Sequence, residues 1–156
     1  MLITEQTIEQ EANKLDASTE NYELAIAELT RDQPYILAYF FSDAFRMLTP
    51  EEQSYMLYLG LVVWKSIQTQ GTTTSQITED QIGQAEEKVW EIMELTSNKK
   101  FRERLDPFFD NTEEEDLLAF IEDSLVTDAE DKDDFLTKAG REMIFVGLKT
   151  VMNCLI

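Results

Sequence analysis

Four acidic residues have types and a spacing that could support metal-dependent chemistry. Glu91 and Glu94 lie one helical turn apart, as ExxE, and Glu113 and Asp116 repeat this spacing further along the chain, as ExxD. Carboxylate oxygens are ligands that Mg²⁺ prefers, and a bound Mg²⁺ can orient a substrate and activate a water molecule. The chemistry that these residues would carry is therefore that of carboxylates with a bound magnesium ion.

This pair of patterns resembles the magnesium-binding signature of the all-α nucleotide pyrophosphohydrolases. The resemblance implies a Mg²⁺ cofactor, held by the four carboxylates, that activates water on a nucleoside triphosphate. The helical pattern argues against it, because Glu91 and Glu94 lie opposite the apolar stripe of their helix and Asp116 points away from its apolar neighbours. A metal site between helices needs its carboxylates on the packed side. We therefore keep this enzyme as an alternative hypothesis.

The remaining catalytic groups are scarce. The chain has no histidine and a single cysteine, Cys154. Histidine is the commonest general base and metal ligand, so its absence excludes catalytic triads that contain it, and zinc sites of the usual kind. We predict no catalytic residue and no cofactor, and we favour a function other than catalysis.

The charge balance of the chain is strongly negative. Its 156 residues include 32 acidic and 13 basic side chains, which gives a formal net charge of -19. Such a surface repels phosphate backbones and anionic lipid headgroups and attracts basic proteins. We therefore expect a basic protein partner, and neither nucleic acid nor a membrane.

The sequence also bears on location. The first residues, MLITEQTIEQE, carry acids where a secretory signal has bases and an apolar run, and no segment approaches the ~20 apolar residues that span a bilayer. A lone cysteine cannot form an internal disulfide, which suits a reducing compartment. We expect a cytoplasmic protein.

The acids concentrate in residues 106–134, which begin with the motif DPFFD. The two phenylalanines of this motif either anchor the connection in the core or stand outside as a recognition point ringed by charge. The acids at 113–116 either bind a partner or offset the dipole at the start of a helix. Our hypothesis places the partner-binding surface on Phe108, Phe109, Asp110, Glu113, Glu114 and Glu115.

A basic cluster precedes this acidic segment. It consists of Lys99, Lys100, Arg102 and Arg104, directly after a predicted helix end, where cations are favoured. These side chains either hold an anionic ligand or pair with the nearby acids at 106–116, and we expect the internal pairing.

One acid of the same region lies on the apolar side of its helix. Glu86 is beside Val89, Trp90 and Met93, and a buried carboxylate needs a partner. We expect a lysine or arginine, and a catalytic or ligand-binding acid is the alternative. A cavity beside Trp64, Trp90 and Glu86 would make the protein a small-molecule-binding helical bundle, which is a third hypothesis.

The elements that must position these residues are helices. Threonine is followed three residues later by Glu or Gln at Thr49, Thr78 and Thr112, which is the pattern of a capping box, and glycine and proline are rare. The patterns predict helices near 4–16, 19–31, 34–48, 50–69, 79–97, 113–126 and 132–155, with a short helical turn near 99–105.

Two of these helices are apolar almost all round. Residues 55–64, YMLYLGLVVW, place apolar side chains in every direction, and the C-terminal helix leaves only a thin strip of Glu142, Lys149 and Asn153. We predict a single all-α domain, a bundle of about six or seven helices with helices 50–69 and 135–155 at its centre. Residues 55–64 are covered either by their own chain or by a second copy in a homodimer.

The function that the sequence favours is that of a non-catalytic interaction or regulatory module. Its negative surface, densest at 106–134, would bind a basic partner.

Overall fold

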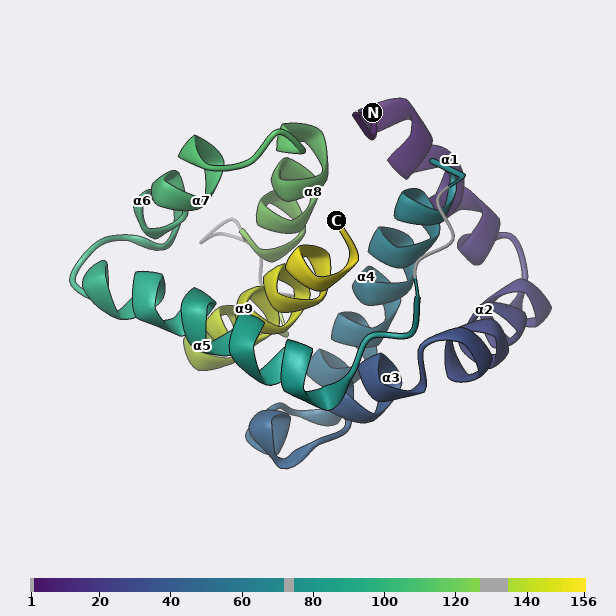
Figure 1. The fold of residues 1–156 in the computed structure, drawn as a ribbon, viewed down its shortest axis with the longest axis horizontal. Helices are drawn as coiled ribbons and strands as arrows, with labels where there is room; N and C mark the ends of the chain where they lie inside the picture. Colours follow the sequence, from purple (N-terminus) through teal and green to yellow (C-terminus); the bar gives the residue numbers. More distant parts are fainter. Residues whose placement is uncertain (1, 72–74, 127–134) are drawn as a thin grey trace.

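The computed structural model describes residues 2–71, 75–126 and 135–156, and these residues form helices and short connections without any strand. The predicted all-α class is therefore confirmed, and the longer helices match the predicted number of about six or seven. Figure 1 shows the order of the elements: α1 (Glu5–Asp16), α2 (Thr19–Asp32), α3 (Pro34–Phe40), the 3₁₀ turn η1 (Asp43–Phe45), α4 (Pro50–Gln68), α5 (Glu79–Leu95), α6 (Phe101–Arg104), α7 (Asp106–Asp110), α8 (Glu115–Leu125) and α9 (Lys138–Leu155).

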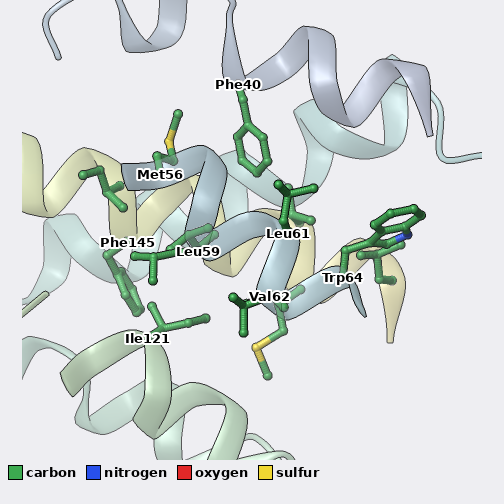
Figure 2. Packing of buried hydrophobic residues seen from close by; sticks show 14 of the residues in the cluster. Phe40, Met56, Leu59, Leu61, Val62, Trp64, Ile121 and Phe145 are labelled. Atoms are coloured by element: carbon green, nitrogen blue, oxygen red, sulfur yellow. The ribbon is translucent and has the colours of Figure 1, made fainter. Parts of the chain in front are cut away.

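Helices α4 and α9 form the centre of the fold, as predicted. Every residue from Leu59 to Trp64 is buried, and α9 packs against both α4 and α5. Figure 2 shows Phe40 of α3, Ile121 of α8 and Phe145 of α9 reaching the buried side chains of α4. A single chain thus covers the apolar segment 55–64, and the homodimer remains a prediction.

The N-terminal ends of the two central helices are joined by one carboxylate. Glu52 is fully buried, and its Oε1 accepts a hydrogen bond from the backbone N–H of Thr49 at 2.9 Å. Its Oε2 accepts from the N–H and the hydroxyl of Thr137, at 3.0 and 2.9 Å. Burial alone would raise the pKa of Glu52, but the hydrogen bonds from Thr49 and Thr137 outweigh it and lower the pKa. Glu52 therefore stabilises the starts of both helices as an anion.

A glycine makes this contact possible. A Cβ atom at Gly140, in the first turn of α9, would overlap the carboxylate of Glu52. Thr137 is the N-cap of α9, and its hydroxyl accepts from the N–H of Gly140. The close approach of α9 to Glu52 thus requires a residue without a side chain at position 140.

The predicted helix 34–48 is wrong in its second half, because α3 ends at Phe40. Phe40 packs against Gly60 of α4, and Phe45 packs against Gly147 of α9, so closely that a Cβ atom on either glycine would overlap the ring. On a continuous helix, residues five apart point about 140° away from each other. The chain therefore leaves the helix so that both rings reach the core.

This break exposes residues that the pattern had placed on a buried stripe. Phe41 is 56% exposed and Met47 is 76% exposed. The hydroxyl of Ser42 donates a hydrogen bond to the carbonyl of Tyr39 at 2.7 Å, a local bond that competes with helix continuation.

Two of the three predicted capping boxes are present, at Thr49 and Thr78. The third is wrong: Glu114, not Thr112, is the N-cap of α8, and the hydroxyl of Thr112 accepts from the N–H of Glu114 at 3.1 Å. The C-terminal helix, predicted from 132, begins at Lys138, and residues 132–134 lie outside the described residues.

We expect Glu52→Gln to lower the free energy of unfolding by about 3 kcal/mol at pH 7, because an amide replaces one acceptor oxygen with a donor that faces other donors. The control Glu51→Gln, on an exposed neighbour, should change it by less than about 1 kcal/mol. Since folding lowers the pKa of Glu52, its contribution is present above the unfolded pKa of ~4.3 and is lost as the pH falls through the folded pKa. Urea titrations of both variants between pH 7 and 3 measure this, and a pH-independent difference would contradict it.

A second titratable group lies inside α9. Lys149 is only 7% exposed, its ammonium donates to the side-chain oxygen of Asn153 at 2.7 Å, and burial lowers its pKa to about 8. The unfolded chain holds this proton up to pH ~10, whereas the folded protein releases it near pH 8. The contribution of Lys149 therefore makes the free energy of unfolding rise with pH between about 8 and 10.

We therefore expect Lys149→Met to be about 2 kcal/mol more stable than the natural protein at pH 7, with an advantage that disappears near pH ~10. Lys88→Met, at an exposed position of α5, is the control for loss of a positive charge. Thermal unfolding at pH 7, 8, 9 and 10 gives the comparison, and an advantage that stays constant over this range would contradict it.

Candidate functional site

Helices α1 and α8 are held together at one end by two acids. Glu114, which is buried, accepts a hydrogen bond from the backbone N–H of Ile3 at 2.8 Å. Asp116 accepts from the N–H of Glu5, the first residue of α1, at 3.2 Å. Both carboxylates thereby bind N–H groups at the start of α1, where negative charge is favourable.

Beyond this attachment a groove lies between the two helices. It has a volume of about 440 Å³, and it is lined by one face of each helix. Four apolar side chains line it, of which Ile8 is buried and the other three are partly buried: Ile8, Ala12, Ala119 and Phe120. The groove therefore offers apolar surface that its own chain leaves accessible.

The polar residues that line this groove are dominated by carboxylates. Four exposed acids line it: Glu5 and Glu9 from α1, and Asp116 and Asp123 from α8. No cation is among the described residues that line it, and the nearest contact with one is between Asp123 and Arg102 Nη1 at 3.8 Å. The groove thus combines apolar surface with a locally negative potential, which a basic amphipathic segment would complement.

The six residues predicted to bind a partner are not all on the surface. Phe108 is 4% exposed and packs against Phe145, with ring centroids 5.1 Å apart, and Phe109 is partly buried against the core. Glu114 is buried against Ile3. Asp110, Glu113 and Glu115 are exposed. Only the latter three are therefore available to a partner, close in sequence to the α8 wall of the groove.

The basic cluster pairs with different acids from those predicted. Arg102 Nη1 donates to Glu122 at 2.7 Å, and Arg104 Nη2 donates to Glu142 at 3.0 Å. The prediction that these two arginines pair with acids at 106–116 is wrong, because α6 turns them towards α8 and α9. Lys99 and Lys100 are exposed.

Glu86 has a partner of another kind than predicted. The hydroxyl of Tyr39 donates to its Oε2 at 2.5 Å, so the predicted lysine or arginine partner is wrong. Burial, and then the hydrogen bond to Glu86, raise the pKa of Tyr39 well above its ordinary value. Trp64 is 3% exposed, and Trp90 is partly buried. The contact of Glu86 with Tyr39 therefore joins α5 to α3 in the structure.

The four carboxylates of the hydrolase hypothesis do not come together. Glu91, Glu94, Glu113 and Asp116 are all exposed. Among the described residues, no three Asp, Glu, His or Cys side chains are placed so that they could hold a metal ion. Asp116 is instead engaged by the N–H of Glu5.

Sequence reasoning missed the groove itself. Its wall residues Glu5, Glu9 and Asp123 and the residues Ile8 and Phe120 belong to two amphipathic helices far apart in the chain. The pattern of each helix separates a polar from an apolar face. It does not say that α1 and α8 lie side by side with a gap between them, which depends on the Glu114 and Asp116 contacts.

The chain matches no known family model, and neither a curated protein nor a solved structure matches it. Within the described residues, no helix combines the length and the apolar character that crossing a membrane requires.

We expect Glu114→Ala to loosen the start of α1, because the buried N–H of Ile3 would lose its acceptor, at a cost of about 1 to 3 kcal/mol. Hydrogen exchange should accelerate at the amides of Ile3 and Glu5 while α4 and α9 keep their protection. Glu113→Ala is the adjacent, exposed control. Unchanged exchange at Ile3 would contradict the role of Glu114.

Proposed function

We propose that the protein is a non-catalytic interaction module that binds a basic amphipathic helix of a partner protein in the groove between α1 and α8. The observation that carries this proposal is the groove, with Ile8 and Phe120 among its apolar residues and exposed carboxylates around them. An amphipathic helix binds such grooves through residues on one face, and its cations then meet the acids at the edges.

The dimensions of the groove fit an occupant of this kind. The lining residues of α1 run from Glu5 to Ala12, a span of ~11 Å, which corresponds to about two turns of a bound helix. Apolar side chains of the partner would cover Ile8 and Phe120. Its lysines or arginines would lie near Glu9 and Asp123, and Asp110, Glu113 and Glu115 are further exposed acids close in sequence to the α8 wall.

The wider charge of the chain supports a basic partner. A net charge of -19 accelerates the encounter with a basic protein and repels acidic competitors. The lone cysteine, Cys154, is free, which suits a reducing compartment, and we propose that the protein acts in the cytoplasm.

The charge of the groove is tested by reversing Glu9 and Asp123 together to lysine. Immobilised natural protein should capture a basic protein from native lysate at ~50 mM salt and release it at ~500 mM, because screening shortens the range of the attraction. The groove variant should lose this protein. The control variant, Glu23→Lys with Glu87→Lys, changes two exposed acids elsewhere by the same total charge and should retain it.

Synthetic peptides from the captured protein would then identify the helix that binds. This peptide would be titrated against the natural protein, the groove variant and the control variant. Equal loss of binding in the groove and control variants would show that only the overall charge matters. Absence of any protein captured in a salt-sensitive manner would also overturn the proposal.

The apolar part of the groove makes a separate prediction. Phe120→Ala should weaken binding of the mapped peptide about tenfold, mainly through faster dissociation, whereas reversal of Glu9 and Asp123 should mainly slow association. Phe41→Ala removes an exposed ring outside the groove and is the control. Surface plasmon resonance separates the two rates. An unchanged dissociation rate in Phe120→Ala would place the apolar contact elsewhere.

A further inference from the structure

A second hollow has the opposite charge from the rest of the molecule. It has a volume of about 350 Å³ and lies where α6 and residues 97–100, which connect α5 to α6, meet the first turns of α9. Five cations line it, and Glu142 is the single acid among the described residues that do so. We call this hollow the basic pocket, and its cations are Lys99, Lys100, Arg104, Lys138 and Arg141.

Most of this positive charge takes part in no ion pair among the described residues. Arg104 pairs with Glu142. Within the described part of the chain, the other four cations take part in none of the ion pairs. Acids outnumber bases 32 to 13 in the sequence, so carboxylates are abundant as partners. Four cations gathered at one hollow, with no carboxylate partner among the described residues, favour a site whose negative charge comes from a ligand.

The two arginines of the basic pocket are held in place. Arg104 is 8% exposed, and its Nη2 also donates to the carbonyl of Met93 at 2.8 Å. The guanidinium carbon of Arg141 lies 4.6 Å from the centre of the Phe101 ring, and that ring packs on Phe145 at 6.1 Å between centroids. Stacking of this kind fixes the plane of a guanidinium group. The positions of both groups are therefore set before any ligand binds.

Both arginines also keep a donor without an acceptor. The Nε atoms of Arg104 and Arg141 are buried, and neither has a hydrogen-bond partner among the described residues. A buried donor left without a partner is costly and rare in folded proteins. An oxyanion in the basic pocket would not reach these enclosed Nε atoms, but its negative charge would offset the cost of enclosing the two guanidinium groups.

We propose that the basic pocket binds a compact phosphate-bearing small molecule. Arginine forks match the geometry of phosphate oxygens, and the lysines add charge without a directional requirement. The volume suits a small metabolite rather than a polymer. The strongly negative remainder of the chain repels nucleic acids and anionic membranes, whereas a small ligand enters a local positive field. This site is independent of the groove between α1 and α8.

The test uses pyrophosphate as the probe and NMR chemical shifts of the full chain at constant ionic strength. Pyrophosphate should shift the amides of residues 97–104 and 138–142 with a saturable dependence, and inorganic phosphate should act on the same amides more weakly. Sulfate at equal ionic strength should bind at least about tenfold more weakly than pyrophosphate, because it carries less charge.

Two variants locate the site. Lys99→Gln with Lys138→Gln should raise the dissociation constant for pyrophosphate about tenfold or more, because two charges of the basic pocket are lost. Lys88→Gln with Arg46→Gln removes two exposed cations elsewhere and should leave it within about twofold. Arg141→Lys keeps the charge but removes the fork, and it should weaken binding about tenfold as well.

The melting temperature of each variant without ligand reports whether it folds, and these exposed lysines should be replaced without loss of the fold. No saturable shift up to millimolar pyrophosphate would overturn the proposal. If the two double variants raised the dissociation constant equally, pyrophosphate would be attracted by the overall charge alone, and the proposal would also be overturned. Tighter binding of a phosphoserine peptide than of any small phosphate would assign the pocket to a protein ligand and would equally overturn it.

Discussion

The buried carboxylate of Glu52 is the interaction on which the rest of the structure depends. It belongs to the capping box of α4, and it also accepts two hydrogen bonds from Thr137, the cap of α9. Helix α4 and the C-terminal helix α9 therefore start from a common point, and the contacts of Gly147 with Met56 and of Gly60 with Leu148 continue from there. Because the first turns of α9 carry Lys138 and Arg141, the same carboxylate fixes one side of the basic pocket.

The outer helices are attached by a related use of acidic residues. Glu114 and Asp116 accept backbone N–H groups at the start of α1, so part of the large acid surplus is structural. Carboxylates at helix N-termini are stabilised by the helix dipole and by N–H groups that lack partners within the helix. Since α1 is fastened to α8 at this end, the remainder of the two helices can leave a groove without separating.

The sequence predicted the features that are encoded locally. The all-α class, the burial of α4 and the caps at Thr49 and Thr78 follow from spacings of three or four residues, which are the distances over which a helix repeats. The second role of Glu52 could not be predicted, because Thr137 lies 85 residues away. The end of α3 is similar, since it depends on two glycines of distant helices, Gly60 of α4 and Gly147 of α9, which leave room for the rings of Phe40 and Phe45. Glu86 could be recognised as needing a partner, but its choice of Tyr39 depends on how α3 packs on α5.

One short helix, α6, contributes to the separation of the acidic groove from the basic pocket. Arg102 and Arg104 are two residues apart in α6, so on a helix their side chains point in widely different directions. Arg102 reaches Glu122 and Asp123 of α8, and Arg104 reaches Glu142 of α9. Four residues are too few for a helix to be stable by itself, so the packing of Phe101 on Phe145, the burial of Arg104 and these ion pairs hold α6 in place. Because Asp123 lines the acidic groove and Arg104 lines the basic pocket, α6 forms part of the boundary between the two fields. The separation of positive from negative surface therefore arises from tertiary contacts between helices, although all of its charges are visible in the sequence.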